Sequence, residues 1–158
     1  MKTSVGQVCY FDSSALVKRY FTEIGSVWVQ TRCGDSKNLI VIAEITRVEM
    51  AAAFARKVRG KFITQAEYHQ AQTQIISHIQ NQYRLVAITS QRIDTAVDLT
   101  SQHKLRGYDA VQLACALYFN QLLVSKVLSP LIFISADNEL LIAAQAEGLQ
   151  TENPNNYP

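Results

Sequence analysis

The acidic residues of this sequence that are best placed to do chemistry are Asp12, Glu49, Asp109 and Asp137. Asp12 and Asp137 each follow a short apolar run, so we expect each at the carboxyl end of a buried parallel strand. Ligands of open α/β sheets bind beyond those strand ends. Carboxylates gathered at one rim raise one another's pKa values, and a divalent cation with oxygen ligands, Mg²⁺ or Mn²⁺, relieves their repulsion. The ligand types are carboxylates without histidine or cysteine, which argues against zinc.

Helix capping is the alternative role of three of these acids. Asp12 and Asp137 each precede a helix-forming stretch, where a carboxylate oxygen can accept a hydrogen bond from an amide of the first turn. Asp109 with Gln112 has the spacing of a capping box. For each residue alone capping is the commoner role, and it is their gathering at one rim that favours a metal site.

Glu49 lies in a predicted helix from Glu44 to Arg59. The helix face expected to meet the core consists of Ile45, Val48, Ala52 and Ala55. Glu49 borders that face, where a carboxylate is costly unless a partner satisfies it. A metal site would satisfy it, and so would an ion pair with Arg47 or Arg56.

Short apolar runs alternate with helical patterns along the whole chain. The runs predict strands that end at Phe11, over Asn38–Ala43, Leu85–Ile88 and Leu131–Ser135, with a further edge strand near Thr151. Helices are predicted over Ala15–Tyr20, Ile24–Arg32, Glu44–Arg59, Thr64–Tyr83, Thr89–Ser101, Asp109–Asn120 and Asn138–Glu147. This alternation is typical of a three-layer α/β/α sandwich with a parallel four- or five-stranded sheet.

Length and composition indicate a single globular domain over residues 1–158, with 48% hydrophobic and 18% charged residues. The cysteines Cys9, Cys33 and Cys115 are odd in number, far apart and in apolar surroundings, which favours reduced core residues. The sequence has no secretory signal pattern and no apolar run of membrane-spanning length, so we expect a cytoplasmic protein that does not enter the membrane.

Four stretches together resemble the motifs of PIN-domain nucleases, especially the VapC-type toxins of toxin–antitoxin pairs. The stretches, in order, are Tyr10–Lys18 (YFDSSALVK), Ile45–Met50 (ITRVEM), Arg106–Ala114 (RGYDAVQLA) and Phe133–Leu140 (FISADNEL). They occur in the order and at the spacing of that family and span nearly the whole chain. Arg47 is a departure, because family members commonly carry an apolar residue there.

The resemblance implies an endoribonuclease that uses Mg²⁺ or Mn²⁺ to hydrolyse RNA phosphodiester bonds. By the same resemblance, Asp12, Asp109 and Asp137 would hold the metal, and Glu49 would complete the acidic catalytic pocket. The hydroxyls that match the family's supporting positions are those of Ser14 and Ser135. A homodimer and a cognate antitoxin that covers the acidic pocket are also implied.

Contacts to RNA are expected from basic residues near the motifs, above all Arg106 and Lys18. Two other functions remain open from the residues alone. One is a phosphatase or phosphotransfer domain with an aspartate nucleophile, although Ser14 stands where such enzymes often carry a second acid. The other is a non-catalytic module whose acidic pocket only binds a metal or a partner's basic tail.

Overall fold

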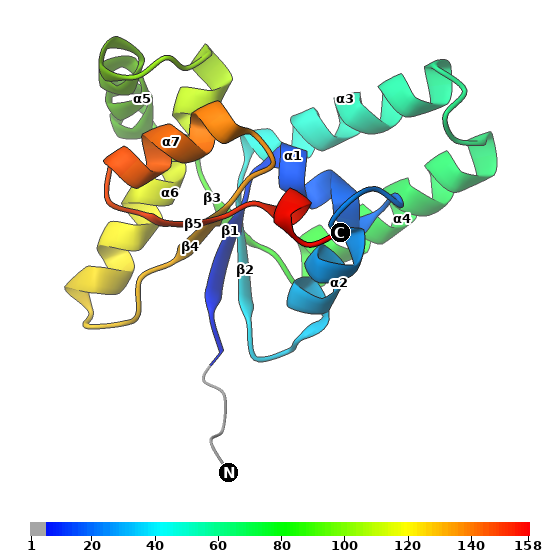
Figure 1. Cartoon of the computed structure of the whole chain (residues 1–158), viewed down its shortest axis with the longest axis horizontal. Helices are drawn as coiled ribbons and strands as arrows, with labels where there is room; N and C mark the ends of the chain where they lie inside the picture. The colour runs from blue at the N-terminus through cyan, green and yellow to red at the C-terminus, as the bar shows by residue number, and fades with distance from the viewer. Residues whose placement is uncertain (1–5) are drawn as a thin grey trace.

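A computed structural model describes residues 6–158, which form a parallel sheet with helices on both of its faces (Figure 1). The strands lie in the order β3-β2-β1-β4-β5, and all four neighbouring pairs are parallel. Their bounds are β1 Val8–Phe11, β2 Leu39–Ala43, β3 Arg84–Val86, β4 Ile132–Ile134 and β5 Gln150–Glu152. The predicted three-layer fold is confirmed, including the fifth strand at the edge of the sheet.

The three central strands are apolar along their whole length because helices cover both of their faces. Tyr10 of β1 pairs with Val41 of β2 on one side and with Phe133 of β4 on the other. Successive side chains alternate between the faces of the sheet. Tyr10 therefore packs into one core cluster, and its neighbours Cys9 and Phe11 pack into the other.

The helices divide between the two faces of the sheet, as Figure 1 shows. On one side lie α1 (Ser13–Leu16), the short 3-10 helix η1 (Val17–Arg19), α2 (Ser26–Gly34), α3 (Ile45–Arg59) and α4 (Gln65–Asn81). On the other side lie α5 (Ser90–Gln102), α6 (Gly107–Ser125) and α7 (Asn138–Ala146). A second 3-10 helix, η2 (Pro154–Asn156), follows β5.

Helix α6 is longer at both ends than the predicted Asp109–Asn120. Arg106 is extended (φ −73°, ψ 158°) and serves as the N-cap residue, so the helix begins at Gly107. After Asn120 the chain continues with good helix formers, and Leu123 is buried in the core.

The predicted core-facing stripe of α3 is wrong except for Ile45, which is partly buried against the core. Val48 is 64% exposed, whereas Thr46, Met50 and Phe54 are the buried residues of this helix. The helix is rotated so that the large apolar side chains of Met50 and Phe54 enter the core, while Val48 and Ala52 face outward. Burial of the larger apolar area contributes more stability.

Thr64 and Glu67 form a capping box at the start of α4. The prediction for the three cysteines is confirmed. Cys9, Cys33 and Cys115 are buried free thiols. Within residues 6–158, none of the helices combines the length and the hydrophobicity needed to span a bilayer.

Candidate active site

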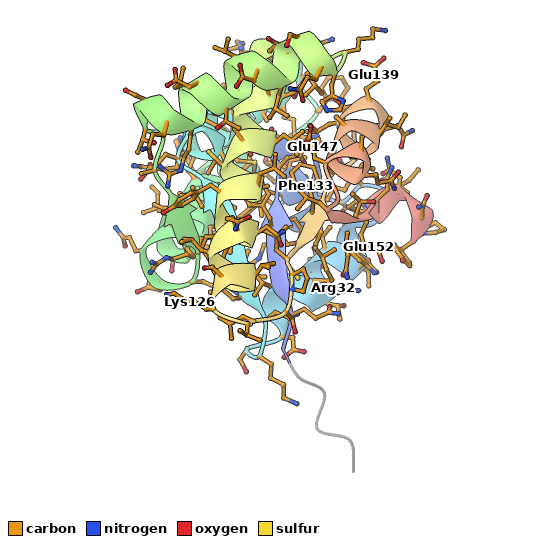
Figure 2. All side chains as sticks on the ribbon, turned by 90° about the vertical axis from the view of Figure 1, so that its left-hand side faces the viewer. Arg32, Lys126, Phe133, Glu139, Glu147 and Glu152 are labelled. Carbon is orange, nitrogen blue, oxygen red and sulfur yellow. The ribbon has the colours of Figure 1, made fainter. Side chains whose placement is uncertain are left out.

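The acidic residues lie at the end of the molecule toward which the parallel strands point. Asp12 follows β1 directly, and Asp137 follows β4 after two residues. In Figure 2, α6 runs across the sheet with Lys126 at its lower end, so its first turn, which carries Asp109, lies at the upper end. The labelled Glu139 marks the first turn of α7 at that same upper end.

Asp12 is both a helix cap and a buried carboxylate. Its Oδ1 accepts the Ala15 N–H at 3.0 Å, which caps α1 as the capping alternative predicted. The hydroxyl of Ser14 donates to Oδ1 at 2.8 Å, and that of Ser135 donates to Oδ2 at 2.7 Å. The pKa of Asp12 is raised to about 6, chiefly by burial and to a smaller extent by the charge of Glu49, while these hydrogen bonds oppose the increase.

Ser14 and Ser135, predicted as supporting residues, connect the ends of β1 and β4. Their hydroxyl oxygens lie 3.3 Å apart. The Ser14 Oγ accepts the Ala136 N–H at 2.9 Å, and the Ser135 Oγ accepts the Asp137 N–H at 3.0 Å. The two hydroxyls therefore fix Asp12 relative to the backbone that carries Asp137.

Glu49 forms neither of the ion pairs considered from the sequence. Its Oε1 accepts Gln112 Nε2 at 2.6 Å, and its Oε2 accepts the Ser13 hydroxyl at 3.1 Å. Arg47 instead pairs with Glu44 at 3.2 Å on the exposed side of α3. The helix rotation described above explains the difference, because it turns Glu49 toward α1 and α6 and leaves Arg47 in solvent.

Gln112 is the residue of this site that sequence reasoning missed. It is 1% exposed, accepts the Tyr10 hydroxyl at 2.7 Å, and donates to Thr46 Oγ1 at 2.8 Å as well as to Glu49. The capping box of Asp109 with Gln112 is therefore wrong. A single glutamine between Val111 and Leu113 in an apolar helical run was the available signal, because a buried amide requires partners.

Asp109 and Asp137 differ in how tightly they are held. Asp137 caps α7 by accepting the Glu139 and Leu140 N–H groups at 2.9 and 3.3 Å. Asp109 lies in the first turn of α6 and is partly buried. Desolvation raises its pKa, the charges of Asp137 and Glu49 raise it further, and the neighbouring Arg106 lowers it. The acids are thus close enough to repel one another.

The two residues predicted to contact substrate have different surroundings. Arg106 is exposed beside Asp109, and its guanidinium donates to the Tyr108 hydroxyl at 3.1 Å. Lys18 is 6% exposed, and its amino group pairs with Glu23 at 3.4 Å. The structure therefore brings Arg106 to the acidic rim and directs Lys18 away from it, because Lys18 lies in the turn of η1 that faces Glu23.

The donor set at the rim fits a hard divalent cation. It consists of carboxylate and hydroxyl oxygens, which Mg²⁺ and Mn²⁺ prefer. The charges of Asp137 and Glu49 raise the pKa of Asp109, and a cation would neutralise this excess of negative charge. Among residues 6–158, however, no three histidine, cysteine or acidic side chains already converge as a set of ligands. Metal binding would require these side chains to reorient.

Comparison with known proteins gave relatives in sequence and in fold. No protein-family model matches the sequence. Ribonuclease VapC45 of Mycobacterium tuberculosis is 33% identical over 108 residues, which are 68% of this chain and 74% of that protein. A toxin–antitoxin complex from Klebsiella pneumoniae contains a similar fold, with a TM-score of 0.61, 17% identity and coverage of 92% of this chain and 97% of that chain. VapBC2 from Rickettsia felis, solved with a promoter DNA fragment, also has a TM-score of 0.61, with 10% identity and coverage of 93% and 98%.

Proposed function

The chain belongs to the VapC family of PIN-domain ribonucleases, and we propose from this premise that it is an endoribonuclease that hydrolyses RNA phosphodiester bonds with Mg²⁺ or Mn²⁺. The observation that supports the proposal is the acidic rim formed by Asp12, Glu49, Asp109 and Asp137: the charge of Glu49 acts on Asp12, those of Glu49 and Asp137 act on Asp109, and the pKa values of Asp12 and Asp109 are raised. Perturbed carboxylates in a group are typical of catalytic sites.

Asp12, Asp109, Asp137 and Glu49 would hold the metal. A bound divalent cation supplies a water of lowered pKa and stabilises charge on the phosphate. Ser14 and Ser135 orient Asp12 by donating to both of its oxygens. Arg106 would contact the RNA phosphate beside Asp109.

The proton of the attacking water requires a carboxylate acceptor, and Glu49 and Asp109 are the candidates. Both oxygens of Glu49 already accept hydrogen bonds from Gln112 and Ser13. Asp109 is only partly buried in the first turn of α6 and is less constrained, so its carboxylate is the more available acceptor. We therefore assign the proton-accepting role to Asp109.

A cleavage assay with purified protein and single-stranded RNA tests the function. We expect cleavage in Mg²⁺ or Mn²⁺, products with a 5′-phosphate, and loss of activity in EDTA. Asp109→Asn should reduce kcat at least 100-fold, which is the usual contribution of a general base. Undiminished cleavage in EDTA would contradict the metal mechanism, and an absence of cleavage in every metal would favour the non-catalytic module.

We also propose that the protein forms a homodimer and that a cognate antitoxin inhibits it in the cytoplasm. The Klebsiella pneumoniae protein with this fold is part of a toxin–antitoxin complex. Expression of the chain alone should arrest growth, and co-expression of the adjacent small gene should restore growth. If expression is harmless while the purified protein cleaves RNA, the toxin role is wrong and the nuclease role stands.

The phosphotransfer alternative receives no support from the geometry. Such an enzyme needs an aspartate oxygen that is free to attack phosphorus. Both oxygens of Asp12 accept hydrogen bonds from Ser14, Ser135 or the Ala15 amide.

A further inference from the structure

A hollow of about 420 Å³ adjoins the acidic rim and is not explained by the metal site. Glu49, Ser13 and Ser14 form its border with the rim. Its apolar floor consists of Val17 from η1 and Ala52 and Ala53 from α3. A larger hollow of about 600 Å³ lies between η1 and α4 and contains none of the four acids. The smaller hollow is therefore the one continuous with the site of chemistry.

An aromatic ring and a cation complete the walls of this hollow. Tyr108 is 45% exposed, and its ring lines the hollow from the first turn of α6. Arg56 lines it from α3, is exposed, and has no carboxylate partner within residues 6–158. Glu49, Ala53 and Arg56 follow one another along one side of α3, and Arg56 lies about 10 Å beyond Glu49 along the helix axis.

These features match the chemistry of one nucleotide. A nucleobase stacks on aromatic rings and on apolar surfaces irrespective of its sequence, and an arginine binds phosphate. The volume is within the usual range for small-molecule sites, which begins at about 300 Å³. Because Arg56 lies two helical turns beyond Glu49 on α3, it is placed to bind a neighbouring phosphate of the same strand.

We propose that this hollow is a nucleotide subsite, in which Tyr108 stacks on the base next to the scissile phosphate and Arg56 binds the following phosphate. This proposal rests on the proposed ribonuclease function. It adds the requirement that the substrate has an unpaired, unstacked nucleotide next to the cleavage site. RNA-binding proteins commonly read single strands by stacking unstacked bases on aromatic side chains. Tyr108 and Arg56 would thus select single-stranded RNA without a strong preference for one base.

Abasic substitution in the substrate tests the role of Tyr108. The cleavage site of one single-stranded oligoribonucleotide is first mapped, and abasic residues are then placed singly at each position that flanks it. For the wild-type protein, an abasic residue at one of the flanking positions should raise KM on the order of tenfold, because one stacked base is lost. The Tyr108→Ala protein should have a similarly raised KM for intact RNA. An abasic residue at the sensitive position should raise its KM no further. Tyr108→Phe keeps the ring but not the hydrogen bond from Arg106, and it should keep the same abasic penalty at that position as the wild type.

Arg56→Gln tests the phosphate contact, and Arg59→Gln, one turn further along α3 and outside the hollow, is its matched control. Arg56→Gln should raise KM and reduce the slope of log KM against log salt by about one, while Arg59→Gln should change neither. A Tyr108→Ala protein that keeps wild-type KM and the full abasic penalty overturns the subsite. If the wild-type protein cleaves no RNA, the proposed function itself fails, and this outcome is recognised before any variant is measured.

Discussion

At the scale of single residues, the carboxylate of Asp109 should destabilise the metal-free protein. Its pKa is raised by desolvation and by the charges of Asp137 and Glu49, so the folded state holds its proton more tightly than the unfolded state does. Ionisation of Asp109 at neutral pH therefore costs stability. We expect Asp109→Asn to raise the free energy of unfolding in EDTA by less than about 1 kcal/mol, because solvent screens a partly exposed carboxylate.

Thermal melts of the same two proteins in Mn²⁺ complete this prediction. Metal that binds only the folded state stabilises it by mass action. Asp109→Asn should lose most of the increase in Tm that Mn²⁺ gives to the wild type. A variant that keeps the full Mn²⁺ increase would remove Asp109 from the metal site.

The stability of the metal-free protein should also depend on pH through Asp12. Its pKa is about 6 in the folded state against an ordinary value of 3.8. Since the folded state binds the extra proton between these values, wild-type stability should fall as pH rises from about 4 to about 6, by on the order of 3 kcal/mol.

Urea unfolding in EDTA from pH 4 to pH 8 measures this pH dependence. Asp12→Asn should lack the fall, because an amide does not titrate, while its oxygen can still cap α1. Asp98→Asn, an exposed acid on α5, is the control. Parallel curves for the wild type and Asp12→Asn would show that the folded protein does not raise the pKa of Asp12.

At this scale, the sequence predicted features that depend on one continuous segment, and it did not predict contacts between residues of distant segments. Asp12 and Asp137 follow apolar runs, so their position at strand ends could be predicted locally. The partners of Glu49 could not, because Ser13 and Gln112 come from α1 and α6 and their approach depends on how α3 is rotated. The burial of Lys18 likewise depends on Glu23, which lies in the loop that follows η1.

At the scale of elements, the capping box of α4 should stabilise that helix independently of the active site. The Thr64 hydroxyl oxygen accepts the Glu67 N–H at 3.1 Å, and the Glu67 Oε2 accepts the Thr64 N–H at 2.6 Å. We expect Thr64→Ala to lower the free energy of unfolding by about 1 kcal/mol. Urea denaturation measures this loss of stability. The rate of RNA cleavage by Thr64→Ala should equal that of the wild type.

Thr73→Ala is the matched control for the cap, since Thr73 is exposed in the middle of the same helix. Alanine has the higher helix propensity there, so this variant should be equal to the wild type or slightly more stable. Equal losses in Thr64→Ala and Thr73→Ala would mean that the capping bonds add nothing to stability.

Element types were easier to predict than the faces that elements bury. The runs that became β1, β2 and β4 are apolar throughout, and this is a property of the local sequence. In α3, by contrast, alanines occur on several sides of the helix and give no clear stripe. The rotation of α3 is set by Met50 and Phe54, which fill the space against the sheet. The hydrophobic pattern of the helix alone does not contain this information.

At the scale of the whole molecule, the two cores of the sandwich are joined at the rim by Gln112. One core cluster contains Tyr10 and most of the buried residues of α6, and the other contains Met50 and Phe54 of α3. Gln112 extends from α6 to Thr46 and Glu49 of α3 and also accepts the hydroxyl of Tyr10. The position of Glu49 in the acidic site thus depends on the packing of both layers.

Gln112→Leu should therefore lower both stability and activity, and the two losses should respond differently to a second substitution. The change leaves the buried Tyr10 hydroxyl without an acceptor, at a cost of about 1–3 kcal/mol. Tyr10→Phe removes that orphaned group, so the double variant should be more stable than the sum of the single losses predicts, by on the order of 1 kcal/mol. The same second substitution cannot return a donor to Glu49, so kcat for RNA should stay at the level of Gln112→Leu.

Urea denaturation and RNA cleavage rates of the wild type, the two single variants and the double variant measure the stability and the activity. Recovery of kcat in the double variant would show that Gln112 acts on the site through Tyr10 and not by holding Glu49.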